Sequence, residues 1–420
     1  MRRISPRVLV SAAAVAVALT AAQPAVAGVW TPVASGTTSE ISNIEYQSAT
    51  RMWFTTKAGE IFTRQVDGTF LRTFGPSAIP LNDIEFLPGG AIGFAVGNNG
   101  QVLRSVNSGA TWASVNTGGS PIPVSKKSTT FPDCTASEPL GNVNSVRIAS
   151  PTRVYLFAAK DQMARSEPAN AANLGAAGQW HDANRKSDNT CKLQTSYADG
   201  IDDAFFVPSN PDVAYITTAF FAETFLTTDD LATTATKQPA DSGNGDISTR
   251  RMAGDPSNPN RMWVVGPGGN DLSYTKATTD GWNTSSTFAI GNPDAHAFGT
   301  PYDVDFAGGT VLVAGDGGMV LDSADGSTFY YNGADGAQAT TGWRAAALAS
   351  ATDGAIGGVG GQLAMTAAAN TIPAAPTPTP TPTPTPAPTP APKPAPAFTL
   401  TGSGNGASAR RSGGKVKVVV

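Results

Sequence analysis

Carboxylates and arginines recur at matching places along this 420-residue chain. They fall in short segments of about six residues in which polar and apolar side chains alternate. Two carboxylates that lie about 5 to 9.5 Å apart can serve a glycoside hydrolase as acid and as base or nucleophile. Carboxylates crowded around one axis also raise each other's pKa, which is one route to a general acid. The candidate residues are Asn43, Glu45, Asp83, Glu85, Arg147, Asp202, Asp203, Arg250, Arg251, Asp303 and Asp305.

A second interpretation gives the same side chains no catalytic role. They could be solvated, paired with the arginines, or satisfied by backbone N–H groups. In either case we expect them to face a common axis, where they would form a ligand-binding surface. The side chains that we assign to this channel face are Glu45, Asp83, Glu85, Arg147, Asp203, Arg251, Asp303 and Asp305.

The segments that carry these residues return every 40 to 60 residues or so, and this repetition predicts the architecture. Short strands at a fixed period indicate units that cannot bury their own faces and must stack on their neighbours. Four strands in a unit of about 49 residues fit one blade of a β-propeller. We predict an all-β fold with seven blades, with six or eight as alternatives. The predicted innermost strands are 41–46, 81–86, 143–148, 201–206, 247–252, 301–306 and 343–348.

Glycines and the two ends of the repeat array support this prediction. A glycine is expected in the tight turn after the second strand, because that turn requires a positive φ. The last unit lacks an outer strand, whereas residues 28–35 precede the first inner strand, so we expect that segment to close the ring. Closure would remove an exposed sheet edge. The turn glycines are Gly59, Gly100, Gly269, Gly318 and Gly361; Asp161 and Phe220-Phe221 depart from the pattern.

The two ends of the chain differ in composition from the propeller at 28–372. Residues 1–27 have a basic start, an apolar run and small residues before Ala27, which predicts a secretory signal peptide cleaved after Ala27. We therefore expect a secreted protein at the cell surface or wall, with no transmembrane segment. Residues 373–397 form a Pro/Thr-rich linker. Residues 398–420 are expected to begin an incomplete β domain, in which the alternating segment 415–420 has no later strand to pair with.

Cys134 and Cys191 are the two cysteines of the chain. Because an exported protein enters an oxidising compartment, we predict that they form a disulfide. Such a bridge would stabilise the fold by about 4 kcal/mol in the chain-entropy model. Two unpaired, buried thiols are the alternative.

A polar turn recurs in the outer part of several units. Residues 105–112 (SVNSGATW) resemble the Asp-box, or BNR-type, repeat of sialidases, photosystem II assembly-factor propellers, sortilin-type receptors and some endoglucanases. The resemblance implies a propeller in which the box has a folding role away from the active centre. It does not supply the sialidase catalytic set, because the chain lacks the Arg-Ile-Pro motif of that family. The box residues are Ser105, Asn107, Gly109, Thr111 and Trp112, with weaker copies at Asp229, Asp280 and Asp325.

Charge and composition exclude several function classes. All 32 acidic residues lie within 28–372, which argues against nucleic-acid binding. His181 and His296 are the two histidines and belong to no ligand-spaced cluster, so we expect neither a metal nor a cofactor. We predict a monomeric, non-catalytic propeller that recognises a surface protein or glycan. The alternative is a sialidase-like or endoglucanase-like glycoside hydrolase that uses the inner-strand carboxylates.

Overall fold

The computed structural model describes most of the predicted propeller and one hairpin near the C-terminus. The described residues are 30–115, 122–127, 134–193, 200–218, 223–239, 251–266, 274–292, 299–332, 341–369, 408–412 and 415–419. The chain divides into two units, Met1–Ala374 and Ala375–Val420. The predicted signal peptide and linker lie outside the described residues. Within these residues, no helix has the length and apolar character needed to cross a membrane.

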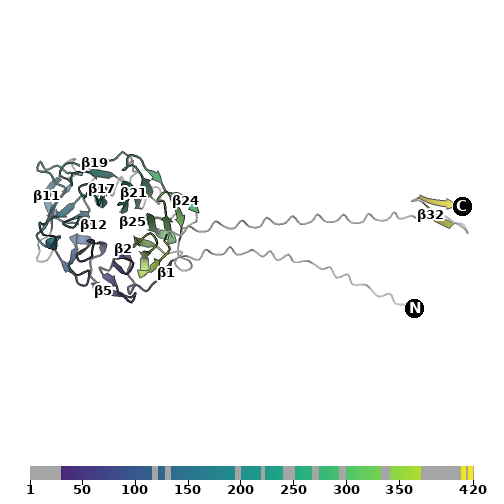
Figure 1. The fold of residues 1–420 in the computed structure, drawn as a ribbon, viewed down its shortest axis with the longest axis horizontal. Helices are drawn as coiled ribbons and strands as arrows, with labels where there is room; N and C mark the ends of the chain where they lie inside the picture. The colour runs from purple at the N-terminus through teal and green to yellow at the C-terminus, as the bar shows by residue number, and fades with distance from the viewer. Residues whose placement is uncertain are drawn as a thin grey trace. The chain divides into compact units, whose positions relative to one another are not determined.

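The first unit is a β-propeller of seven blades around a central channel, as predicted (Figure 1). Each blade is a sheet in which successive strands pair antiparallel from the channel outward. The first three blades are β2 (Ile41–Ser48), β3 (Arg51–Thr56), β4 (Ile61–Arg64) and β5 (Phe70–Phe74); β6 (Leu81–Phe86), β7 (Gly93–Gly97), β8 (Val102–Ser105) and β9 (Ala113–Ser114); and β12 (Val143–Ser150), β13 (Arg153–Ala158), β14 (Met163–Ser166) and β15 (Trp180–Asp182).

The next three blades follow the same plan, and the sixth gains an extra strand. They are β16 (Ile201–Phe206), β17 (Ala214–Thr218), β18 (Thr224–Thr227) and β19 (Thr236–Lys237); β20 (Arg251–Asp255), β21 (Asn258–Gly266), β22 (Tyr274–Thr278) and β23 (Ser286–Thr287); and β25 (Pro301–Ala307), β26 (Thr310–Gly315), β27 (Val320–Ser323) and β28 (Thr328–Tyr331). The extra strand, β24 (Ala289–Asn292), pairs with β28 in parallel on the outside of blade six.

The seventh blade closes the ring with a strand from the other end of the array. Its strands are β29 (Trp343–Leu348), β30 (Gly354–Gly358), β31 (Leu363–Thr366) and β1 (Thr31–Pro32). Thr31 lies opposite Met365, and the Val33 N–H donates to the Leu363 carbonyl at 2.9 Å. The prediction that residues 28–35 supply the missing outer strand is confirmed at β1.

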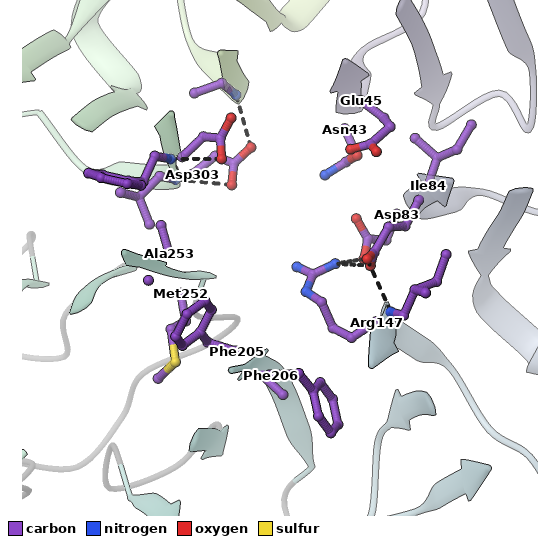
Figure 2. Close-up of a pocket in the computed structure, with 18 of the residues that line it drawn as sticks. Asn43, Glu45, Asp83, Ile84, Arg147, Phe205, Phe206, Met252, Ala253 and Asp303 are labelled. Atoms are coloured by element: carbon purple, nitrogen blue, oxygen red, sulfur yellow. Dashed lines mark hydrogen bonds and ion pairs between the residues drawn. The ribbon is translucent and has the colours of Figure 1, made fainter. Parts of the chain in front are cut away.

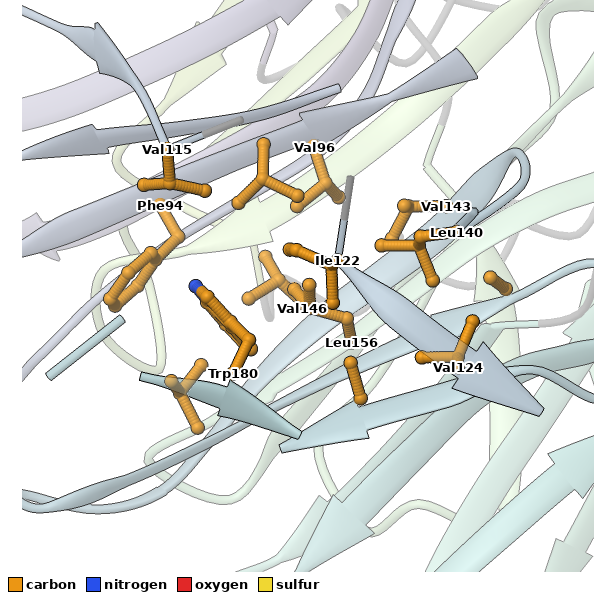
Figure 3. Packing of buried hydrophobic residues seen from close by; sticks show 14 of the residues in the cluster. Phe94, Val96, Val115, Ile122, Val124, Leu140, Val143, Val146, Leu156 and Trp180 are labelled. Atoms are coloured by element: carbon orange, nitrogen blue, oxygen red, sulfur yellow. The ribbon is translucent and has the colours of Figure 1, made fainter. Parts of the chain in front are cut away.

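The apolar core is distributed around the ring between the blades. Among the described residues, seven buried clusters each join two neighbouring blades. Figure 3 shows the cluster between blades two and three, where Phe94 and Val96 of β7 pack with Val146 of β12 and with Trp180 of β15. The blades thus bury their faces against each other, as repeats of this kind must.

The predicted fifth inner strand ends three residues too early. We expected it at 247–252, but β20 spans Arg251–Asp255, and 247–250 lie outside the described residues. The strand includes Gly254, a residue with low strand propensity. Phe205 of the previous blade leaves no room for a side chain there. Close packing therefore selects a residue that the alternation pattern does not recognise as part of a strand.

Turns after the second strand have the predicted backbone conformation where they are described. Gly59 has a φ of 69°, and a Cβ there would collide with Ser77 and Ile79. Asp161 takes the same left-handed conformation in blade three, with a φ of 56°. Gly269 and Phe220-Phe221 lie outside the described residues. Short 3-10 turns occur at η1 (Asn98–Gly100), η2 (Ala171–Asn173), η5 (Asp316–Gly318) and η7 (Val359–Gly361).

In the part of the chain that the structure describes, two hairpins lie outside the blades. The first, β10 (Pro123–Lys127) with β11 (Cys134–Pro139), is inserted between blades two and three and was not predicted. Cys134 at the start of β11 forms the predicted disulfide with Cys191. The second hairpin pairs β32 (Ser408–Ser412) with β33 (Lys415–Val419). The alternating segment at 415–420 was expected to have no later strand to pair with, and β33 pairs with the strand that precedes it.

Candidate functional site

Within the described residues, two cavities of about 320 Å³ each lie in the channel and are lined by different parts of the inner strands. The acidic cavity is lined by their later residues, with the carboxyl groups of Glu45, Asp83, Glu85, Asp303 and Asp305 and the guanidinium group of Arg147 (Figure 2). The basic cavity is lined by their first residues and by adjoining turns, with Lys57, Arg251, Arg344 and Glu40 as its charged groups. Because neighbouring inner strands lie side by side, the two cavities are at opposite ends of the channel.

Carboxylates of one blade accept hydrogen bonds from the backbone of the next blade. The carboxylates of Asp83, Asp203 and Asp303 occupy matching places on the inner strands of blades two, four and six. Each accepts a hydrogen bond from a backbone N–H of the following inner strand. The donors are Val146 at 2.9 Å, Met252 at 3.0 Å and Ala346 at 2.9 Å.

A second row of carboxylates lies two residues further along the strands. Glu85 accepts from the Ile148 N–H at 3.1 Å, and Asp305 accepts from the Leu348 N–H at 2.7 Å. Glu45 accepts in the same way from the backbone of Phe86. The inner strand is the edge of each blade, and its unpaired N–H groups need acceptors when they are buried. These acidic residues meet that need, as the second interpretation of the sequence proposed.

Two arginines join several of these carboxylates. Arg147 contacts Asp83 at 2.7 Å, Asp203 at 2.6 Å and Glu85 at 3.5 Å. Arg251 lies 3.9 Å from Asp83 and donates to two backbone carbonyls, those of Asn82 at 3.1 Å and Asn144 at 3.3 Å. Because these partners belong to different blades, each arginine connects several blades across the channel.

Burial changes the protonation of the acidic cavity. It raises the pKa of Glu85 to about 7 and that of Asp303 to about 7. Burial also raises the pKa of Asp305, and it raises that of Glu45 well above the ordinary value, with Glu85 and Asp305 adding repulsion. The cavity therefore holds more carboxyl groups than Arg147 can neutralise.

The basic cavity contains a network of asparagine amides. The Asn82 amide donates to the Asn98 side chain at 3.0 Å and to the Val143 carbonyl at 2.8 Å, and it accepts from Lys57 at 2.8 Å. Burial and the nearby Arg251 lower the pKa of Lys57. Arg344 pairs with Asp316 at 2.5 Å and lies 4.0 Å from the centre of the Tyr302 ring. This end of the channel is thus rich in cations and amide donors.

The structure brings most of the predicted channel-face residues together. Glu45, Asp83, Glu85, Arg147, Asp303 and Asp305 line the acidic cavity. Asp203 is fully buried beside Arg147, and Arg251 lines the basic cavity instead. Asp202 is not among the residues that line either cavity. Its Oδ1 accepts a hydrogen bond from the Asn144 Nδ2 at 3.4 Å. Arg250 lies outside the described residues.

Sequence reasoning missed the polar residues of the basic cavity. Asn82, Asn144, Tyr302 and Arg344 each occupy the second position of an inner strand, one residue before the position of the acidic row. The alternation that pointed to the acidic residues could have indicated them too. Lys57, Asn98 and Asn142 come from turns between strands, and the inner-strand repeat contains no signal for them.

The Asp-box residues form the turns between third and fourth strands. In each turn a backbone N–H donates to the side chain at the Asp position: to Asn107 at 3.0 Å, Asp229 at 3.1 Å, Asp280 at 2.9 Å and Asp325 at 2.9 Å. In the first box the donor to Asn107 is the Thr111 N–H. There the Ser105 hydroxyl also accepts from the Gly109 N–H, and the Trp112 indole N–H donates to the Gly109 carbonyl. Hydrogen bonds from the Thr233 and Thr284 hydroxyls, together with backbone N–H groups, lower the pKa of Asp229 and of Asp280. Backbone N–H groups bring the pKa of Asp325 to about 2. The turns have a folding role, while membership of an Asp-box family stays a prediction.

Among the described residues, no group of three or more His, Cys, Asp and Glu side chains is arranged to hold a metal ion. No protein-family model matches the sequence. No curated protein matches it either.

Solved structures with a similar fold are propellers. One is described as YCF48 bound to D1 peptide, with 15% identity and a TM-score of 0.53 over 80% of this chain and 96% of that chain. YCF48 from Cyanidioschyzon merolae has 14% identity and a TM-score of 0.54 over 80% and 98%. The WD40 β-propeller domain of Doa1 has 11% identity and a TM-score of 0.52 over 80% and 96%. Identities this low show a shared fold.

Proposed function

We propose that this chain is an exported, non-catalytic recognition protein that binds a segment of a partner protein at the basic cavity of its channel. The observation that carries the proposal is the open cavity of about 320 Å³ at this mouth, with Lys57, Arg251 and Arg344 among its lining residues. Such a set of donors suits the carbonyl and carboxylate oxygens of an extended peptide.

Two asparagines at this mouth are suited to bind a peptide backbone. Within the described residues, Asn98 and Asn142 each use their side-chain oxygen as an acceptor, from Asn82 and from the Asn99 N–H. Their NH2 groups are then available to donate into the cavity. A propeller of similar fold, YCF48, has been solved with a D1 peptide, which shows that this architecture can hold a peptide.

The alternative, glycoside hydrolysis, needs a carboxylate that can exchange a proton with a substrate. Glu85 and Asp303 have pKa values raised to about 7, which would suit a general acid. Both carboxylates, however, accept backbone hydrogen bonds that join two blades. Their position is explained by the stability of the ring.

Peptide selection with the purified protein tests this proposal. Peptides selected from a random display library should lose affinity in Asn142→Ala by about 3- to 10-fold, the effect of one hydrogen bond. Glu45→Gln, a change at the other mouth, should leave their affinity unchanged. Failure to select any peptide, together with binding on a glycan array, would replace the protein partner by a glycan. Cleavage of glycans that is lost in Asp303→Asn would establish the hydrolase instead.

A further inference from the structure

The acidic cavity is lined by more carboxyl groups than cations. Five carboxyl groups line it, and Arg147 is the guanidinium group among its lining residues. Arg147 is already engaged with Asp83 and Asp203 at 2.7 and 2.6 Å. Figure 2 shows Asp303 across the cavity from Arg147. Among the described residues no cation forms an ion pair with Asp303 or with Asp305 of the same strand, although Arg251 acts on Asp303 over a longer distance.

A polar side chain without a partner points into the same cavity. Asn43 occupies on blade one the place that Asp83, Asp203 and Asp303 occupy on blades two, four and six. It is only 8% exposed, and its amide has no hydrogen-bond partner among the described residues. Figure 2 shows the amide directed into the open space between Glu45 and Arg147. Because the amide faces the cavity, a ligand that enters there can supply the hydrogen bonds that the described residues do not.

The carboxylates favour one kind of cation. Both oxygens of Asp303 and both of Asp305 accept backbone N–H groups, and Glu85 divides its two oxygens between Ile148 and Arg147. Each of these oxygens keeps a lone pair, but the N–H donors beside it leave less room for a planar guanidinium fork than for a compact cation. An ammonium group, a compact charge with three donors, can instead contact single oxygens from separate side chains.

The size and walls of the cavity suit a ligand larger than a bare ion. A volume of about 320 Å³ greatly exceeds the space of one small ion, and no described group of ligands is arranged for a metal. The lining also includes Ile84, Phe205 and Met252. These apolar side chains can pack against methylene groups while the charged head reaches the carboxylates.

We propose that the acidic cavity binds an alkylammonium group, presented either by a lysine side chain of a partner segment or by a free polyamine. The ammonium donates to Glu45 and to remaining lone pairs of the carboxylate rows. Asn43 supplies its carbonyl oxygen after a half-turn of its amide. This site lies at the opposite mouth from the peptide site proposed above, so either can exist without the other.

Isothermal titration calorimetry of the full chain tests the site with defined probes. The first is the peptide acetyl-Gly-Gly-Lys-Gly-Gly-amide, the second is the same peptide with an acetylated lysine, and the third is spermidine. We expect the lysine peptide or spermidine to bind and the acetylated peptide to bind at least about tenfold more weakly, since acetylation removes the charge. Binding of the lysine peptide assigns a partner segment as the source, and binding of spermidine alone assigns a free polyamine.

Three variants connect the binding to this cavity. Glu45→Gln should weaken binding about tenfold, because a bound ammonium favours the ionised form of the Glu45 carboxyl and an amide cannot supply that charge. Asn43→Ala should weaken it severalfold, and it removes no hydrogen bond from the fold. Glu40→Gln makes the same change of charge at the basic cavity and should have no effect. Equal binding of the acetylated peptide, unchanged binding in both Glu45→Gln and Asn43→Ala, or no binding of any probe at millimolar concentration would overturn the proposal.

Discussion

Replacing Asp303 by asparagine should make the fold less sensitive to pH. The Asp303 side chain is 5% exposed, and burial raises its pKa to about 7 from an ordinary value of 3.8. The stability that this raised pKa provides is fully present below pH 3.8, and it is lost as the pH rises through 7. Between these values the folded chain keeps a proton that the unfolded chain has released, so the free energy of unfolding falls by about 1.4 kcal/mol per pH unit.

The expected size of the effect follows from this slope. From pH 5.5 to 8.5 the titration of Asp303 alone removes about 2 kcal/mol, because the slope applies only up to the folded pKa. Asparagine does not titrate, yet its amide oxygen can still accept the Ala346 N–H that Asp303 accepts at 2.9 Å. We therefore expect Asp303→Asn to lose about 2 kcal/mol less than the native protein over this range.

Urea denaturation followed by tryptophan fluorescence measures this difference at the two pH values. All seven tryptophans lie between Trp30 and Trp343, so the signal reports on the propeller. Asp325→Asn is a suitable control, because the pKa of Asp325 is about 2 and its charge does not change in this range. An identical loss of stability in Asp303→Asn and the native protein would refute the argument.

Three further changes test other parts of the ring. Arg147→Met should cost about 3–5 kcal/mol, since it leaves buried carboxylates without their cation; a loss below 1 kcal/mol by urea denaturation would contradict this. Reduction of the Cys134–Cys191 bridge should lower stability by about 4 kcal/mol, and an unchanged melting temperature with reductant would show that the bridge is dispensable. Deleting 28–33 removes β1 and should expose the edge of β31, so size-exclusion chromatography should show self-association; a stable monomer would count against closure by this strand. Export predicts that the mature protein begins at Gly28, which mass spectrometry of secreted material can check.

The fold was predictable because the same alternation of polar and apolar residues recurs in the inner strand of each blade. The alternation of Leu81 to Phe86 or Pro301 to Phe306 identifies an inner strand without knowledge of its neighbours. The predicted fifth inner strand ended at Met252 instead of Asp255, because Gly254 is selected by contact with Phe205 of another blade. The strand β24 was missed for a similar reason, since its parallel partner β28 lies more than 30 residues away in sequence.

The sequence identified which residues face the channel, but it identified only part of what these residues do there. The alternation correctly indicated that Glu45, Asp83 and Asp303 face the channel. It could not show that their oxygens bind the N–H groups of the next blade, because such bonds depend on the offset between two separate strands. Nor could it identify Asn43 as a side chain without a partner, since an asparagine in that position could equally have made the bond that the aspartates make.

The first acidic row has a property that depends on the parity of the ring. Acidic residues occupy its blades two, four and six, while blades one, three, five and seven carry Asn43, Ser145, Arg251 and Ala345. A pattern that alternates every second blade cannot close on an odd number without one mismatch. Here two non-acidic blades meet where the seventh joins the first, at the same junction that the N-terminal strand seals. Asn43, whose amide has no hydrogen-bond partner among the described residues, lies at this mismatch. A ring with an even number of blades would have no equivalent position.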